Sequence, residues 1–442
     1  MSFRSLMFFL SATIIAYACY VRAEQNPYAR YVAAGYSVID RWSLMAPADQ
    51  ELFDGALRGM VEVLHKHGDE HSMFVEEQER DLFREDLTQE FSGIGVRIMQ
   101  LGTPPRLTVV GPPEPRTPAF SADIRSGDIL VAIDGQSTEK LSLAESLKLV
   151  RGPSGEPVVL SVIHEGDTKP TDVTIVRATI TVESIVGDLK DDNNRWKFHL
   201  TADQRIGYVR IIKFGDKTEA ELTRALARLH SQGIKALILD VRDNYGGTLD
   251  AAVGISDLFL RAGLPIVTTR DRHGETRDRF VSTGRGGYLE LPLAVLINHN
   301  SASASEILAA CLQDYNRAIV VGERSFGKGT VQRLVQIESG RSLLKLTSAT
   351  YWRPSGQDIH RMPGVAESAP WGVKPNEGFE VPSDDEHYLL WRKYRYRRDL
   401  LGNDQESPLA QQLNEQEGEL PESFTDEALA LAVGYLQTKL GE

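Results

Sequence analysis

The residues best suited to chemistry in this sequence are three alternating serines and a lysine between two glycines. Ser301, Ser303 and Ser305 begin the stretch SASASEILAACLQDYNRAIVVGERSFGKGTVQ, residues 301–332, and Lys328 lies near its end. A serine hydroxyl becomes a nucleophile when a base removes its proton. Burial disfavours the ammonium form of a lysine, so a buried lysine can act as that base. One hypothesis is therefore a hydrolytic pair of a serine and Lys328.

The same residues also fit a purely structural hypothesis. Ser303 and Glu306 have the spacing of a capping box, in which the glutamate binds back to the cap residue. The segment Gly327-Lys328-Gly329 fits a turn. Both hypotheses stay open on composition and spacing alone. They are compatible, because a helix start also supplies free backbone N–H groups.

The neighbours of the lysine and of the serines refine the first hypothesis. A strand that starts at Lys328 would put Lys328, Thr330 and Gln332 on one face, where Gln332 can hydrogen-bond the amine. His299 is close to the serines in sequence but has no acidic partner in a recognisable triad motif. Cys311 lies in the apolar run EILAACL, which favours a small buried side chain over a nucleophile.

The elements around these residues alternate between apolar runs and helical patterns. KALILDVR is followed by DNYGG and the helical LDAAVGISDLFL, and LPLAVLIN is followed by SASEILAACLQDY. RAIVVGE and TVQRLVQI predict further strands. This repetition predicts an α/β domain, in which sites gather where strands end and helices begin. The glycine pair and the serine run both lie at such junctions.

Upstream of this domain, from Phe91, short apolar runs and one helix, LSLAESLKLVRG, predict a β-rich module. The glycines of SGIGV precede a strand, and backbone N–H groups there could bind a peptide carboxylate. A tight turn explains the same glycines equally well. Together with SGDILVAIDG and the helix over 142–150, the set resembles a PDZ domain of the bacterial protease-associated type.

The PDZ resemblance implies a mode of peptide binding. A peptide tail would add as a strand beside Gly95 to Ile98 and would face the 142–150 helix. The residues expected to contact this tail are Gly93, Ile94, Gly95, Val96 and Leu147.

The N-terminus predicts export. In MSFRSLMFFLSATIIAYACYVRAEQ, an apolar run follows Arg4, and Val21-Arg22-Ala23 fits a cleavage site of a signal peptide. The run is shorter than the roughly 20 residues that span a bilayer, so an uncleaved membrane anchor is the second hypothesis. If cleavage follows Ala23, Cys311 is the remaining cysteine and no intramolecular disulfide can form.

Length and charge bound the remaining possibilities. The chain has 442 residues, which predicts two or three domains, and a net charge of -13, which argues against nucleic acid as a partner.

Residues 28–90 have a helical pattern, and the spacing of His65, His67 and His71 fits no standard zinc motif. We therefore predict no metal.

The C-terminal part of the sequence turns polar. Residues 376–421 predict a loop or linker, and DEALALAVGYLQTKL predicts a final helix. The basic cluster Arg392–Arg398 interrupts the polar stretch, and we expect it to be a solvated helix face.

The serine-to-glutamine stretch resembles the signature of the carboxyl-terminal processing peptidases, also called tail-specific proteases. LILDVRDNYGGTLDAAVGISDLFL is similar to that family's Asp-Leu-Arg-Asn-Asn-Pro-Gly-Gly segment, with Tyr245 in the proline position. LFDGALRGMVEVL, EFSGIGVRI, SGDILVAIDG and YWRPSGQDI extend the resemblance over most of residues 50–375. Glu70, where the family commonly has proline, and a longer loop after Ile359 are further departures.

This resemblance implies a role for each matched residue. Ser303 is the expected nucleophile, Lys328 the general base that later protonates the leaving amine, and Gln332 the residue that orients the lysine. The oxyanion would be bound by backbone N–H groups of Ala304 and of the Gly246-Gly247 turn, with the donating glycine left open. No cofactor is expected, and Ser301 and Ser305 would be structural.

The implied fold is a multidomain α/β protein with a β-rich PDZ domain and a peptidase core of the crotonase-like, tail-specific protease type. The expected parts are a signal peptide at 1–23, a helical N-terminal region at 24–90, the PDZ domain at 91–178, the peptidase core at 179–376, and a charged linker with a C-terminal helix at 377–442.

The implied function is an exported serine endopeptidase, periplasmic or otherwise extracytoplasmic, that cleaves proteins or peptides near their C-termini. Its expected partners are substrate C-termini, an adaptor or activator protein, and, through the helical ends, a second copy of the chain. The alternative from another class is a non-catalytic PDZ and peptidase-like scaffold that binds peptides. An esterase or amidase is a third hypothesis.

Overall fold

The structure is a computed structural model that describes Met7, Thr13 and residues 27–45, 47–111, 113–191, 194–401, 420–421 and 424–441. The predicted signal peptide lies outside the described residues, except for Met7 and Thr13. No helix in the described part of the chain is long and apolar enough to cross a membrane. The chain forms two compact units, one from residues up to 78 with 333–346, the other from 79–332 with 347 onward.

The first unit contains the helices that the N-terminal pattern predicts. They are α2 (Pro27–Trp42) and α3 (Asp49–Lys66), followed by the short strand β1 (Met73–Val75). β1 pairs antiparallel with residues 343–345 of β20 (Ser342–Trp352). The Phe53 ring of α3 meets Phe74 of β1 edge to face, at 6.2 Å between ring centroids. Ring packing of this kind attaches the helix to the strand.

The second unit begins with α4 (Glu77–Thr88) and the predicted β-rich module. Strands β2 (Glu90–Gly93) and β9 (Ala178–Thr181) pair at its base. Its sheet has the order β3-β4-β5-β7-β8, with β6 beside β5. The bounds are β3 Ile98–Leu101, β4 Arg106–Val109, β5 Ile129–Ile133, β6 Gln136–Ser137, β7 Pro157–Ile163, β8 Thr171–Val176, α5 Pro118–Ser121 and α6 Leu143–Val150. Leu130, Val158 and Leu160 are fully buried at its centre.

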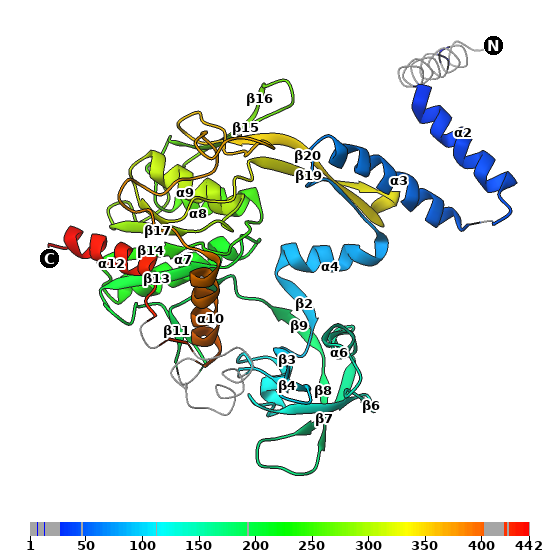
Figure 1. Cartoon of the computed structure of the whole chain (residues 1–442), viewed down its shortest axis with the longest axis horizontal. Coiled ribbons are helices and arrows are strands. Elements are labelled where there is room, and N and C mark those ends of the chain that lie inside the picture. Colours follow the sequence, from blue (N-terminus) through cyan, green and yellow to red (C-terminus); the bar gives the residue numbers. More distant parts are fainter. Residues whose placement is uncertain are drawn as a thin grey trace. The chain divides into compact units, whose positions relative to one another are not determined.

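A mostly parallel sheet forms the centre of the second unit, in the order β10-β13-β14-β17-β18, and Figure 1 labels its central strands β13, β14 and β17. The bounds are β10 Ile185–Val186, β13 Ile206–Ile211, β14 Ala236–Asp240, β17 Leu293–Ile297 and β18 Ile319–Gly322. Every residue of β13, β14 and β17 is buried, as expected for strands covered on both faces. The predicted α/β domain is therefore confirmed.

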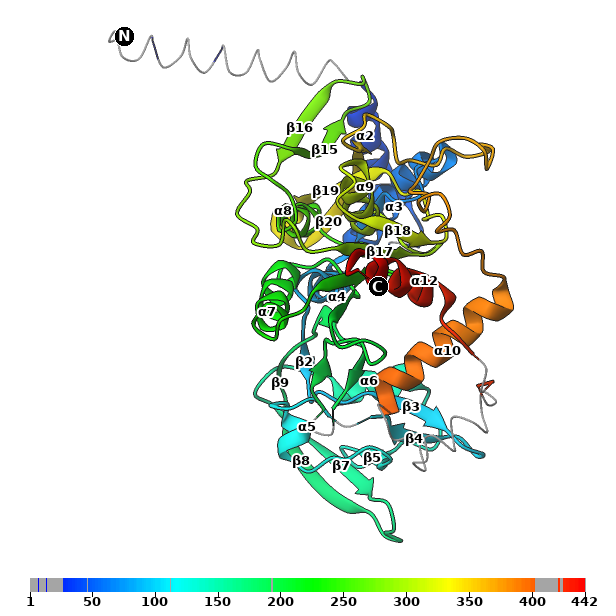
Figure 2. The ribbon, with the colours of Figure 1, turned by 90° about the vertical axis from the view of Figure 1, so that its left-hand side faces the viewer.

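Helices cover both faces of this sheet, which gives three layers (Figure 2). Leu237 and Leu239 point to the face that packs against α7 (Thr218–Ser231), α8 (Leu249–Asp257) and α9 (Ala304–Asp314). Ile238, between them, points to the opposite face, where the C-terminal α12 (Glu427–Lys439) packs. The predicted final helix is thus present and completes the core.

Further strands border the central layers. β15 (Pro265–Arg270) pairs with β16 (Thr276–Val281) and with β20, and β19 (Thr330–Ile337) also pairs with β20. A short 3-10 helix, Glu338–Gly340, joins β19 to β20. β11 (Leu189–Lys190) and β12 (Trp196–Lys197) form a small hairpin.

The predicted linker is wrong for residues 385–401, which form the helix α10 (Asp385–Leu401). The expectation of a solvated basic face is also wrong, because Arg395 and Arg397 are each 5% exposed. Arg395 pairs with Asp399 at 3.0 Å and with Asp188 at 3.4 Å. Long-range acidic partners such as Asp188 explain why so many arginines can be buried there.

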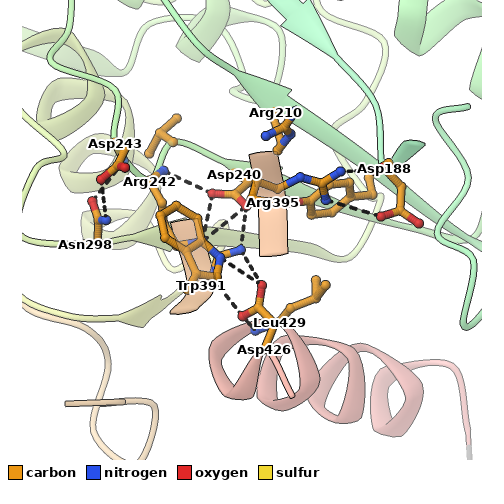
Figure 3. Close-up of polar contacts among 12 residues, drawn as sticks. Asp188, Arg210, Asp240, Arg242, Asp243, Asn298, Trp391, Arg395, Asp426 and Leu429 are labelled. Carbon is orange, nitrogen blue, oxygen red and sulfur yellow. Dashed lines mark hydrogen bonds and ion pairs between the residues drawn. The ribbon is translucent and has the colours of Figure 1, made fainter. Parts of the chain in front are cut away.

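A second group of buried charges fixes the end of β14 (Figure 3). The Arg242 guanidinium donates to Asp240 at 2.7 Å and to Asp426 of the C-terminal segment at 2.8 Å, and it lies 4.6 Å from the Trp391 ring centroid. Tyr208 donates a further hydrogen bond of 2.6 Å to Asp240. Burial acts to raise the pKa of Asp240, but the charge of Arg242 and the hydrogen bonds from Arg242 and Tyr208 together outweigh it, so that pKa lies below its usual value.

We predict that Arg242→Met lowers the free energy of unfolding by about 3–5 kcal/mol, because it leaves Asp240 and Asp426 buried without their cation. Urea unfolding measures the loss. The matched control is Arg261→Met, since Arg261 and its partner Glu290 are 76% and 82% exposed. That control should change stability by less than about 1 kcal/mol. Equal losses in the two variants would contradict the prediction.

Candidate active site

Ser303 lies at the junction that the sequence pattern indicates, between the end of β17 and the start of α9. Its φ angle of 57° is in the left-handed region, which is uncommon for a residue other than glycine. The side chain is 5% exposed. Strained backbone of this kind often occurs at functional sites, and here it presents Ser303 at the N-cap of a helix.

The other two serines join the α9 loop to the segment that follows β14. Ser301 donates to the Val241 carbonyl and Ser305 to the Asn244 carbonyl, both at 2.8 Å. Both serines are fully buried. These bonds hold two backbone segments together, which agrees with the structural role expected for the flanking serines. Ser303 instead lies close enough to Tyr351 to lower the pKa of that phenol, against a larger rise caused by burial.

Asn244 holds the glycine turn against this serine loop. Its carbonyl accepts from Ala302 at 3.0 Å, its Nδ2 donates to Ile211 at 2.5 Å, and its Oδ1 accepts from the Gly246 N–H at 2.8 Å. A Cβ on Gly246 would lie 2.8 Å from the Cβ of Ser303, so only glycine fits. The Gly246-Gly247 turn therefore lies directly beside Ser303.

The backbone N–H groups near Ser303 differ in whether they donate a hydrogen bond. The Gly246 N–H binds Asn244, as just described. For the Gly247 and Ala304 N–H groups, no acceptor is found among the described residues. Ala304 is the first residue of α9, where such free donors are expected.

The carboxylate of Glu306 connects the predicted nucleophile to the predicted base. Oε2 accepts from the Ser303 N–H at 2.8 Å and from the Lys328 N–H at 2.9 Å. Oε1 accepts from the Ser325 hydroxyl at 2.6 Å and from the Gly327 N–H at 2.7 Å. The structure thus brings Ser303 and Lys328 to one oxygen atom, although they are distant in the sequence.

Glu306 is the site residue that the sequence pattern identified only as a helix cap. It does bind the N-cap N–H, but it also binds residues of the glycine-rich turn 19 to 22 positions away. The side chain is fully buried. Burial raises its pKa from 4.5 to about 7, although each of the hydrogen bonds acts to lower it.

The lysine and glutamine positions differ in part from the expectation. β19 begins at Thr330, so Lys328 precedes the strand instead of starting it. Gln332 donates to the Thr330 hydroxyl at 2.9 Å, which confirms that these two residues share a face. The role of Gln332 in orienting Lys328 stays a prediction.

His299 has an acidic partner that the sequence did not indicate. Its Nδ1 lies 2.9 Å from Glu323, and its ring lies 4.6 Å from that of Tyr388.

The Cys311 thiol is buried, which raises its pKa and makes it a poor nucleophile, as expected. No group of side chains suited to a metal ion occurs in the described ranges.

The predicted peptide-binding residues of the β-rich module come from the end of β2, from the loop before β3 and from α6. Gly93 ends β2, and Ile94 is buried and accepts a backbone hydrogen bond from Ala119. Gly95 has a φ of 81°, and a Cβ there would lie 2.5 Å from Thr117. β3 starts at Ile98, so most of the residues expected beside a peptide tail precede this strand, and the pairing with a peptide stays a prediction.

The last two of these residues pack against the core of the module. They are Val96 of the loop and Leu147 of α6. For the Gly95 and Val96 N–H groups, the described part of the chain offers no acceptor. This arrangement is able to receive a carboxylate at the loop and a side chain beside the helix.

Comparison with known proteins connects both modules to families. The model of peptidase family S41 matches residues 205–376, and that of the PDZ domain matches residues 109–163. A carboxy-terminal-processing protease of Bartonella bacilliformis is 36% identical over 388 residues, which cover 86% of this chain and 82% of the relative. A carboxyl-terminal-processing protease of Synechocystis is 35% identical over 67% of this chain and 64% of the relative.

Among solved structures, the photosystem II D1 C-terminal processing protease is 27% identical and has a TM-score of 0.44. The match covers 80% of this chain and 94% of that chain. The two family models agree with the predicted fold class, a PDZ domain with an S41 peptidase core.

The raised pKa of Glu306 predicts a stability that depends on pH. The folded chain keeps a proton that the unfolded chain loses above pH 4.5, so this contribution is complete below 4.5 and is lost as pH rises through about 7. The loss amounts to about 3 kcal/mol, at about 1.4 kcal/mol per pKa unit. Urea unfolding at pH 4.5 and pH 8 should show a smaller pH dependence in Glu306→Gln than in the parent chain.

The control for that experiment is Glu290→Gln, because Glu290 is 82% exposed and binds Arg261 at the surface. This variant should keep the pH dependence of the parent chain. If Glu306→Gln also kept it, the carboxylate would not be the group that titrates.

Proposed function

The chain belongs to peptidase family S41, the family of the carboxy-terminal-processing proteases, and we propose that it cleaves proteins near their C-termini with Ser303 as nucleophile and Lys328 as general base. The observation that carries this proposal is the Glu306 carboxylate, which binds the backbone N–H groups of both residues. A buried carboxylate of this kind fixes two loops relative to each other. The pair therefore has the support that a catalytic dyad needs.

The proposed reaction is an acyl transfer in two steps. The neutral amine of Lys328 takes the proton of Ser303 Oγ while the oxygen attacks the scissile carbonyl carbon. The tetrahedral adduct collapses, the carbon–nitrogen bond breaks, and the protonated lysine gives its proton to the leaving amine. Water, deprotonated by Lys328, then attacks the acyl-enzyme ester, and the released serine oxygen regains a proton.

The oxyanion of each tetrahedral adduct needs donors that are already in position. We assign this role to the Ala304 and Gly247 N–H groups, for which the described residues offer no acceptor. The Gly246 N–H is a weaker candidate because Asn244 already accepts from it. Preorganised donors of this type contribute about 3–4 kcal/mol each to transition-state stabilisation. Gln332 is proposed to steady the lysine from the start of β19.

The PDZ domain is proposed to recruit the substrate by its tail. A terminal carboxylate would accept from the Gly95 and Val96 N–H groups, and the last side chain would lie against Leu147. A free C-terminus would therefore be preferred over a blocked one. Export is also proposed, on the strength of the N-terminal apolar run and its cleavage triplet.

We predict that Ser303→Ala and Lys328→Ala each reduce kcat by a factor of about 1,000 or more. Hydrolysis of an unfolded protein with an apolar tail, followed by mass spectrometry, measures the loss. Ser305→Ala is the matched control, because its hydroxyl binds a backbone carbonyl, so this variant should lose only about 1 kcal/mol of stability. Equal persistence of the substrate with parent and Ser303→Ala would instead support a non-catalytic scaffold. Hydrolysis of small esters but not of proteins would support an esterase.

We further predict that amidation of the substrate C-terminus lowers kcat/KM about tenfold, because an amide cannot replace a carboxylate at the PDZ loop. Gly95→Ala should remove this difference, since its Cβ would collide with Thr117. Gly155→Ala, an open position of the same domain, is the control for the substitution. An amidated substrate that is cleaved as fast as the free acid would contradict tail recognition.

A further inference from the structure

A cavity of about 660 Å³ lies beside the buried charges at the end of β14, and its wall contains none of the proposed catalytic or peptide-binding residues. Its wall includes Asp243, which directly follows Arg242 at the end of β14, and Met99 of β3 in the PDZ domain. The volume is in the usual range for a binding site. The cavity is therefore bordered by residues of both the peptide-binding domain and the peptidase core.

The cavity wall contains five basic residues and three carboxylates, and ion pairs hold four of the basic residues, including Arg392, which lies 3.5 Å from Asp243. Arg210 donates to Asp399 at 2.7 Å, and Arg395 donates to the same carboxylate at 3.0 Å. Arg242 is held by Asp240 at 2.7 Å. A charged ligand would have to compete with these ion pairs, so the cavity does not favour an ion as its occupant.

The exposed part of the wall combines apolar side chains with Arg392, whose side chain is 58% exposed and lies 3.5 Å from Asp243. Leu389 of α10 is 60% exposed and Ile212, just after β13, is 46% exposed, and both line the cavity. Tyr245 is 68% exposed and lies close enough to Tyr388 to act on its hydroxyl electrostatically. Tyr245 immediately precedes the glycine turn and is not itself among the residues that line the cavity.

We propose that this cavity binds an extended apolar segment of the polypeptide substrate, with Ile212 and Leu389 as its apolar subsite. The inference rests on the proposed function, because it identifies the occupant by Asp243, which the cavity wall shares with the loop of the glycine turn. An apolar side chain in this subsite would cover surface that water otherwise contacts.

Neighbouring contacts keep the subsite in place. The Tyr388 hydroxyl lies 3.0 Å from Asp243 and 2.7 Å from Asn300, so it joins α10 to both loops of the active site. Tyr396, further along α10, contacts Met99 at 2.7 Å. Leu389 is thus carried on a helix that is attached both to the peptidase loops and to β3.

Binding to the inactive chain tests the proposal without any cleavage. In the Ser303→Ala background, fluorescence anisotropy compares two labelled peptides of equal length that differ by leucine or serine at one position. Leu389→Ser and Ile212→Ser should each weaken binding of the leucine peptide about tenfold and leave the serine peptide unchanged. Val281→Ser, an exposed apolar position of β16 outside the cavity wall, should behave like the parent. Unchanged thermal unfolding midpoints would show that the variants fold.

An unchanged leucine preference in both cavity variants would overturn the proposal. Inorganic phosphate that displaces both peptides equally would also overturn it, in favour of an anion site. Cleavage assays with the active chain distinguish a failure of the cavity assignment from a failure of the proposed function. If the parent chain cleaves no protein although the binding preference holds, the proposed function fails and the cavity assignment stands. If cleavage occurs but the cavity variants keep the parent's preference, only the cavity assignment fails.

Discussion

The buried carboxylate of Glu306 is the contact on which the arrangement of the active site depends. It accepts from four donors that belong to the serine loop and to the glycine-rich turn of Lys328. The serine loop follows β17 and the glycine-rich turn precedes β19, so this one carboxylate joins two segments from different strands. Placing a carboxylate in a fully buried position is unfavourable, and the hydrogen bonds are what make it tolerable. Both the arrangement of the active-site residues and the local stability therefore depend on the Glu306 side chain.

A second layer of contacts holds the opposite wall of the site. Asn244 fixes the glycine turn against the serine loop, and Arg242, two residues earlier, is clamped by Asp240 and Asp426. Asp426 belongs to the C-terminal segment, which lies beyond residue 376, where the match to the S41 family model ends. The peptidase core is consequently incomplete without residues that follow it, and α10 contributes Tyr388 to the same wall.

The sequence was sufficient to predict the parts of the fold that depend on local patterns. Buried strands such as 236–240, the helix after Ser303 and the β-rich module follow from periodicity, capping and turn residues. The assignment of Ser303 and Lys328 as nucleophile and base rests on family resemblance and stays a prediction, although Glu306 does bind the backbone of both residues. Prediction failed where the structure or the role of a residue depends on contacts with residues that are distant in the sequence. The helix 385–401 looks like a charged linker because the acidic residues that bury its arginines, such as Asp188, are distant in sequence. The second role of Glu306 was missed for the same reason.

The burial of Cys311 has a practical consequence for spectroscopy. In the described part of the chain it is the one free cysteine, and its thiol is enclosed in the core with a raised pKa. Maleimides and similar reagents attack thiolates that solvent can reach, so they would leave it unmodified. A cysteine introduced on the surface of a chain that lacks residues 1–23 could then carry a fluorophore or a spin label at a single chosen point.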